Sequence, residues 1–118
     1  MGLNTIQDTS IYLSKSHYFN KLKDQLSKDF GADDFDISLK ELEFKDAKRL
    51  SSIVYKYLTY LETKNTETFF QILYRIDIPD REFHAEVLCN GLDIQALSDL
   101  VIKRELIKIL LREQYSSI

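Results

Sequence analysis

Residues 46–62 read DAKRLSSIVYKYLTYLE, and this stretch has the clearest periodicity in the chain. Its apolar side chains recur every three or four positions, at Ala47, Leu50, Val54, Tyr57, Leu58 and Leu61. That spacing places them within about 100° of one another around a helix, and most of the charged and hydroxyl side chains fall on the other side. The stretch therefore predicts an amphipathic α-helix with one face in a hydrophobic core.

Upstream, residues 10–29 show a similar pattern. Their apolar side chains and the one that follows fall on a single helical stripe, which comprises Tyr12, Phe19, Leu22, Leu26 and Phe30. Gly31 comes next, at the position where glycine commonly ends a helix. Residues 1–9 are polar and aperiodic, so a flexible tail is expected before a single helical domain over residues 10–118.

The acidic segment GADDFDIS, residues 31–38, is predicted to connect these two helices. Ser38 and Glu41 have the spacing of a capping box, which would start the next helix there. A second start near Lys45 stays open. The aspartates of the segment do not follow the pattern of a calcium loop, because the sixth position counted from Asp29 is Asp34 rather than glycine. A solvated connection is expected.

Residues 66–78 fit two secondary structures. One apolar set, Phe69, Ile72, Leu73 and Ile76, has helical spacing, whereas the set Phe70, Ile72, Tyr74, Ile76 and Ile78 alternates as in a strand. A helix capped by Asn65 is favoured because no second alternating run offers a pairing partner. An α+β fold with a short strand around residues 70–78 is the minor alternative. Pro79 then begins a short helix that ends near Gly91.

The last predicted helix, residues 93–114, has no broad polar face. A helix that is apolar all round is buried, and a domain this small has difficulty covering such a helix alone. A break near Lys103 is one alternative, and cover by a second copy of the chain, a homodimer, is favoured. The predicted interface consists of two exposed tyrosines and four C-terminal side chains: Tyr55, Tyr60, Ile102, Leu106, Ile109 and Leu110.

The composition supports an all-α fold. A length of 118 residues fits one domain, and three glycines and one proline are too few for a turn-rich β fold. A compact bundle of roughly four or five helices is predicted. The net charge of −3 gives no general attraction to nucleic acid, and no apolar run is long enough to span a membrane. The single cysteine excludes an intrachain disulfide and fits a cytoplasmic location.

No residue pattern names a reaction. His84 and Cys89 lie five positions apart, which would leave them about 140° apart on one helix, and Cys89 is expected to be a small buried apolar side chain. Glu82, His84 and Glu86 alternate around a helix and do not converge on one ion. No catalytic residue, metal site or cofactor is therefore predicted.

The favoured function is a small protein-protein interaction or regulatory module without catalytic activity, whose partner is another protein or a second copy. The alternative is a small-ligand-binding protein or enzyme with a site between helices, built from polar groups such as His84, Glu86 or Arg75.

A DNA-binding regulator is the distant alternative. Residues 79–108 have the outline of a helix-turn-helix with Gly91 in the turn, and the second helix would present Gln95, Ser98 and Asp99 to a groove. The region has no lysine or arginine between Arg81 and Lys103 to contact phosphates, so nucleic acid is not an expected partner.

Overall fold

A computed structural model describes residues 10–116, and these residues form helices joined by short connections. The elements in chain order are α1 (Ser10–Leu13), α2 (Ser16–Phe30), α3 (Asp33–Glu41), the 3₁₀ helix η2 (Phe44–Arg49), α4 (Leu50–Lys64), α5 (Thr66–Ile76), α6 (Asp80–Glu82), the π-helical turn η3 (Phe83–Val87) and α7 (Ile94–Ser116). No strand occurs between residues 10 and 116, so the all-α prediction is confirmed and the strand alternative is wrong. The tail predicted at residues 1–9 lies outside the described residues.

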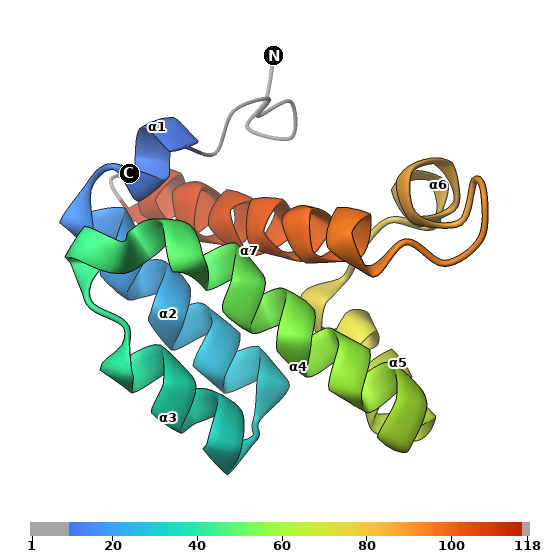
Figure 1. The fold of residues 1–118 in the computed structure, drawn as a ribbon. Coiled ribbons are helices and arrows are strands. Elements are labelled where there is room, and N and C mark those ends of the chain that lie inside the picture. Colours follow the sequence, from blue (N-terminus) through green and yellow to red (C-terminus); the bar gives the residue numbers. More distant parts are fainter. Residues whose placement is uncertain (1–9, 117–118) are drawn as a thin grey trace.

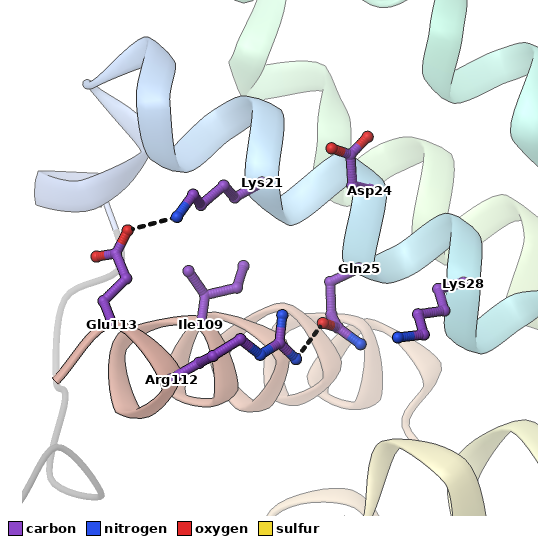
Figure 2. Close-up of a pocket in the computed structure, with 7 residues that line it drawn as sticks. All are labelled: Lys21, Asp24, Gln25, Lys28, Ile109, Arg112 and Glu113. Atoms are coloured by element: carbon purple, nitrogen blue, oxygen red, sulfur yellow. Dashed lines mark hydrogen bonds and ion pairs between the residues drawn. The ribbon is translucent and has the colours of Figure 1, made fainter. Parts of the chain in front are cut away.

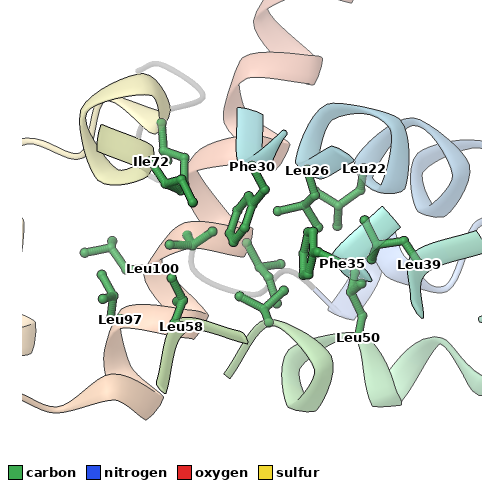
Figure 3. Close-up of a cluster of buried hydrophobic side chains, with 14 of the residues drawn as sticks. Leu22, Leu26, Phe30, Phe35, Leu39, Leu50, Leu58, Ile72, Leu97 and Leu100 are labelled. Carbon is green, nitrogen blue, oxygen red and sulfur yellow. The ribbon is translucent and has the colours of Figure 1, made fainter. Parts of the chain in front are cut away.

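Three long helices form the centre of the bundle. The helix α7 packs against both α2 and α4, and α5 lies against α4 near the end of α2 (Figure 1). Figure 1 also shows α3 and α6 on opposite sides of the molecule. Apolar side chains from these helices meet in one core, in which Leu26 and Phe30 of α2 lie near Leu58 of α4 and Leu100 of α7 (Figure 3).

Several local signals place the helix ends as predicted. Gly31 adopts a left-handed conformation with φ of 61° at the end of α2, and its N–H donates to the Ser27 carbonyl. Asn65 caps α5, because its Oδ1 accepts a hydrogen bond from the Thr68 N–H at 3.2 Å. The predicted stripe is found on α4, with Leu50, Val54, Leu58 and Leu61 buried and Tyr57 half-buried, whereas Ala47 lies before α4 in the 3₁₀ helix η2.

The segment predicted as a connection is largely helical, which corrects the sequence interpretation. Three aspartates, Asp33, Asp34 and Asp36, occupy the first turn of α3, where negative charge favours the positive end of the helix dipole. Phe35 and Leu39, four positions apart, are buried and hold the helix to the core. The predicted capping box is wrong, since Ser38 lies inside α3.

The helix α7 runs unbroken through Lys103, and the chain itself covers it. Ile102, Leu106, Ile109 and Leu110 expose 7% of their surface or less, because α2, α4 and α5 pack around the helix and Tyr12 and Tyr18 cover its C-terminal half. These four residues are core rather than a surface for a second copy. Since the bundle itself buries α7, the apolar surface of this helix gives no reason to expect a homodimer, which stays a prediction.

Candidate functional site

The two residues that suggest catalysis do not form a pair. Cys89 is exposed, which corrects the prediction that it is a buried core residue. His84 is exposed as well, and its Nδ1 lies 2.9 Å from the Asp80 carbonyl, to which it donates a hydrogen bond. Within residues 10–116, no group of three or more histidine, cysteine, aspartate or glutamate side chains is arranged to hold a metal ion.

Of the three α7 side chains predicted to read DNA, one is buried, and the other two are exposed and hydrogen-bonded beside α4. Ser98 is fully buried, and its hydroxyl donates to the Ile94 carbonyl. Asp99 accepts a hydrogen bond from Ser51 of α4 at 3.2 Å, and Gln95 bonds to the same two residues. Of the three predicted side chains, only the exposed Gln95 and Asp99 can therefore face a groove, and the DNA-binding alternative stays a prediction.

The two tyrosines of the predicted interface are exposed but point to different sides of α4. Tyr55 exposes 37% of its surface and lines a hollow with Cys89 and Leu92, whereas Tyr60 exposes 57% and stacks on Tyr57. Five positions along a helix correspond to a rotation of about 140°. The structure therefore gathers neither the two tyrosines nor the six predicted interface residues into one patch.

The aromatic side chains with the largest exposed fractions lie on α5, where no interface was predicted. Tyr74 exposes 87% of its surface and Phe70, one turn earlier, exposes 60%. The opposite face of α5 carries the buried residues Phe69, Ile72 and Ile76. Apolar residues on both faces explain the strand-like alternation in the sequence, and that alternation was the available signal for an exposed apolar face.

Beside these rings is a hollow of about 440 Å³, here named the α5 groove. It is lined by residues of α5, of the following turn and of the segment Asp80–His84: Phe70, Leu73, Tyr74, Asp77, Ile78, Asp80, Phe83 and His84. A second hollow, which contains Glu67 and Arg75, shares Phe70 and Tyr74 with it. The two exposed rings thus stand between two concave surfaces.

The margin of the α5 groove is acidic. Asp77 forms an ion pair with Arg104 at 3.6 Å, yet 80% of the Asp77 side chain is exposed. Asp80, which also lines the groove, forms no ion pair with another residue of the described chain, and neither does Glu67 in the adjoining hollow. The guanidinium of Arg75 donates to the Asp29 carbonyl of α2. The groove therefore combines an apolar floor with carboxylates that are open to solvent.

A second candidate, between α2 and α7, is a hollow of about 340 Å³ (Figure 2). Its charged side chains bond mainly to one another or to neighbouring polar groups: Lys21 to Glu113 at 2.8 Å, and Arg112 to Gln25 at 2.9 Å. Hydrogen bonds from Lys21 and His17 lower the pKa of Glu113 to about 2. Because Lys21–Glu113 and Arg112–Gln25 each join α2 to α7, we assign the hollow a structural role in holding the two helices together.

Glu105 is a fully buried carboxyl group on α7. Burial, followed by its hydrogen bond to Asp29, raises its pKa to about 9, although the nearby Lys108 acts in the opposite direction. Shifts of this size are frequent at functional sites, but Glu105 lines none of the hollows described above. It belongs to the packing of the bundle.

None of the described helices is both long and apolar enough to cross a membrane. Comparison of the chain with protein-family models, with curated proteins and with solved structures gives no match, so the function has to be argued from the geometry of the site itself.

Proposed function

We propose that this chain is a protein-interaction module that binds an apolar segment of a partner protein in the α5 groove. The observation that carries the proposal is the exposure of Tyr74 and Phe70, at 87% and 60%, on one face of a single helix. Scattered exposed apolar residues need no explanation, but two large rings beside a concave apolar floor form a contiguous surface.

The energetics favour a protein partner. Each square ångström of apolar surface removed from water contributes about 25 cal/mol, and aromatic side chains supply a large area with few rotatable bonds. The half-buried side chains of Leu73, Ile78 and Phe83 form a floor into which a partner's apolar residue can insert. Aromatic anchors of this kind commonly carry most of the binding free energy of an interface.

A small-ligand site fits the geometry less well. Sites for small molecules bury most of the ligand surface, whereas the rings of the α5 groove stand largely in solvent. The three polar residues considered for such a site also lie apart: His84 lines the groove, Arg75 the adjoining hollow, and Glu86 a different hollow near Cys89.

The proposal can be tested with a displayed library of random 16-residue peptides selected on the immobilised full-length chain. Affinities of enriched peptides are then measured by fluorescence polarisation. Replacing an aromatic anchor by alanine typically weakens an interface by about tenfold or more, so we expect this loss for Tyr74→Ala and for Phe70→Ala. Tyr60→Ala, which removes an exposed tyrosine outside the groove, should leave the affinity unchanged.

The proposal is overturned if no peptide is enriched, or if the enriched peptides bind the Tyr74→Ala and Phe70→Ala variants as tightly as the unmodified chain. Amide chemical shifts of the peptide-bound protein provide an independent check. The largest changes are expected in α5 and in residues 77–87, and changes confined to another surface would also contradict the proposal.

A further inference from the structure

We infer that the partner segment carries an arginine next to its apolar anchor, an inference that rests on the proposed function of the α5 groove. Two carboxylates, Asp77 and Asp80, lie in the wall of the groove itself, and the residues that line it include no lysine or arginine. An apolar segment with a cation at its edge can pack its apolar side chain on the floor of the groove and place its positive charge beside the carboxylates of the wall. An acidic segment, or an anionic membrane surface, would be repelled by the same carboxylates.

Asp77 is placed to receive such a cation. It ends α5 in a left-handed conformation with φ of 63°, and its N–H donates to the Leu73 and Tyr74 carbonyls. Its carboxylate contacts Arg104 at 3.6 Å, but Arg104 is mostly buried while Asp77 is mostly exposed. Since a carboxylate can accept several hydrogen bonds, the exposed side of Asp77 is available to a second donor.

Asp80, three positions after Asp77, supplies a second carboxylate to the groove. Its backbone carbonyl accepts the His84 hydrogen bond, which ties the start of α6 to η3. Its side chain makes no ion pair with any residue between 10 and 116. The groove therefore contains a carboxylate, that of Asp80, with no ion-pair partner among the described residues.

The exposed ring of Tyr74 favours arginine over lysine as the cation of the partner segment. Its ring is 87% exposed and makes no ring-ring contact with another described aromatic residue, so the ring face is open. A planar guanidinium can stack on an aromatic ring while its N–H groups bond to a carboxylate, whereas an ammonium group lacks that planar surface. Arginine is therefore expected to bind more tightly than lysine at the same position.

The test uses the peptides enriched on the full-length chain. We expect arginine to be over-represented in them relative to the starting library. In one enriched peptide, an Arg→Gln change should weaken binding about tenfold, and Arg→Lys should weaken it by a smaller factor of about three. Asp80→Asn and Asp77→Asn in the protein should each weaken the arginine peptide. Asparagine tolerates the left-handed conformation at position 77, so the backbone there is kept.

A double-mutant cycle assigns the contact. If the peptide arginine pairs with Asp80, the loss caused by Arg→Gln should largely disappear in the Asp80→Asn protein. Glu43→Gln, which changes a carboxylate outside the groove, serves as the matched control and should have no effect. Raising the salt concentration from 50 to 500 mM should weaken the arginine peptide more than its glutamine variant.

The outcomes separate this inference from the proposed function. Peptides that depend on Tyr74 but show no arginine enrichment, or that bind the Asp77→Asn and Asp80→Asn proteins unchanged, would overturn the inference and leave the proposed function standing. Failure to obtain any peptide that depends on Tyr74 would overturn the proposed function, and the inference with it.

Discussion

The ammonium group of Lys108 lies 3.1 Å from the Asp29 carboxylate, although the two residues are 79 positions apart in the chain. The same ammonium donates to the Arg75 carbonyl at 3.0 Å and to the Glu105 carboxyl at 3.3 Å. One lysine of α7 thus connects α2 and α5 around a buried acid. With a pKa of about 9, Glu105 is protonated near neutral pH and acts as the neutral member of this cluster.

The raised pKa of Glu105 predicts how stability responds to pH. In the unfolded chain the group titrates near 4.5, so the folded state binds the extra proton between pH 4.5 and 9. Its contribution to the free energy of unfolding is fully present below pH 4.5 and is lost as the pH rises toward 9. Glu105→Gln stays neutral and retains a donor for Asp29. The free energy of unfolding of this variant, relative to that of the unmodified chain, should rise by up to about 1.4 kcal/mol for each pH unit between pH 5 and 8.

Urea denaturation at pH 5, 6.5 and 8 measures this difference. Glu43→Gln is the matched control, because Glu43 is exposed and its variant should show no such trend. A difference between Glu105→Gln and the unmodified chain that stays constant across this range would contradict the assigned protonation state.

Glu113 should behave in the opposite way. Its pKa of about 2 lies below the unfolded value of 4.5, so its contribution is present above pH 4.5 and is lost as the pH falls toward 2. The Glu113 side chain is partly exposed and its partners Lys21 and His17 are exposed, so solvent screens these contacts, and Glu113→Gln should lower the free energy of unfolding by less than about 1 kcal/mol at pH 7 and low salt. Denaturation in 1 M NaCl should abolish most of that effect. An undiminished loss in high salt would show that the side chain acts through packing instead.

The elements that were predictable from sequence share one property: their signals are local. Leu50, Val54 and Leu58 repeat with the helical period on one face, and a glycine or an asparagine stands at a helix end. Such patterns determine the secondary structure of a segment and the residue at which it ends, whatever the segment packs against. The acidic segment 31–38 misled because its composition resembles a loop, although Phe35 and Leu39 have the spacing of a helix with one buried face.

The burial of α7 and the α5 groove depend on tertiary arrangement. The periodicity shows which faces of α7 are apolar, but the number of helices around it depends on how the bundle closes. The groove likewise forms where α5 meets the segment Asp80–His84, and a sequence pattern does not reveal that meeting. The Lys108 cluster joins residues from three helices for the same reason.

Leu106→Ala tests the position of α7. Leu106 is fully buried in the single chain, and removing a buried leucine side chain commonly costs about 2–5 kcal/mol. We expect that loss in urea denaturation, independent of protein concentration. Leu92→Ala, at a leucine that is 41% exposed, should cost less than about 1 kcal/mol. A Leu106→Ala protein of unchanged stability but altered oligomeric mass would instead place this residue at an interface.

The two faces of α5 should respond differently to truncation. Phe69 exposes only 1% of its surface, so Phe69→Ala should cost about 3–5 kcal/mol. Tyr74→Ala removes a solvated ring and should change stability by no more than about 0.5 kcal/mol. Thermal unfolding of both variants measures this expected difference in stability. A strongly destabilised Tyr74→Ala protein would mean that the ring serves the fold, and its binding data would then lose their meaning.

Gly31 and Asp77 end their helices with nearly the same backbone angle, φ of 61° and 63°. An added Cβ at Gly31 would meet only the Arg75 guanidinium at 3.7 Å, which is an ordinary contact. Gly31→Ala should therefore lower the free energy of unfolding by about 1 kcal/mol, through the cost of the left-handed backbone conformation alone.

Asp77→Gly should raise the free energy of unfolding by about 0.5 kcal/mol, because glycine adopts the same conformation without that cost. It also removes a groove carboxylate, and we therefore expect denaturation to show a more stable protein that binds an arginine peptide more weakly. If Asp77→Gly were less stable, the Arg104 ion pair would outweigh backbone strain. If binding were unchanged, the role of this carboxylate in recognition would be refuted.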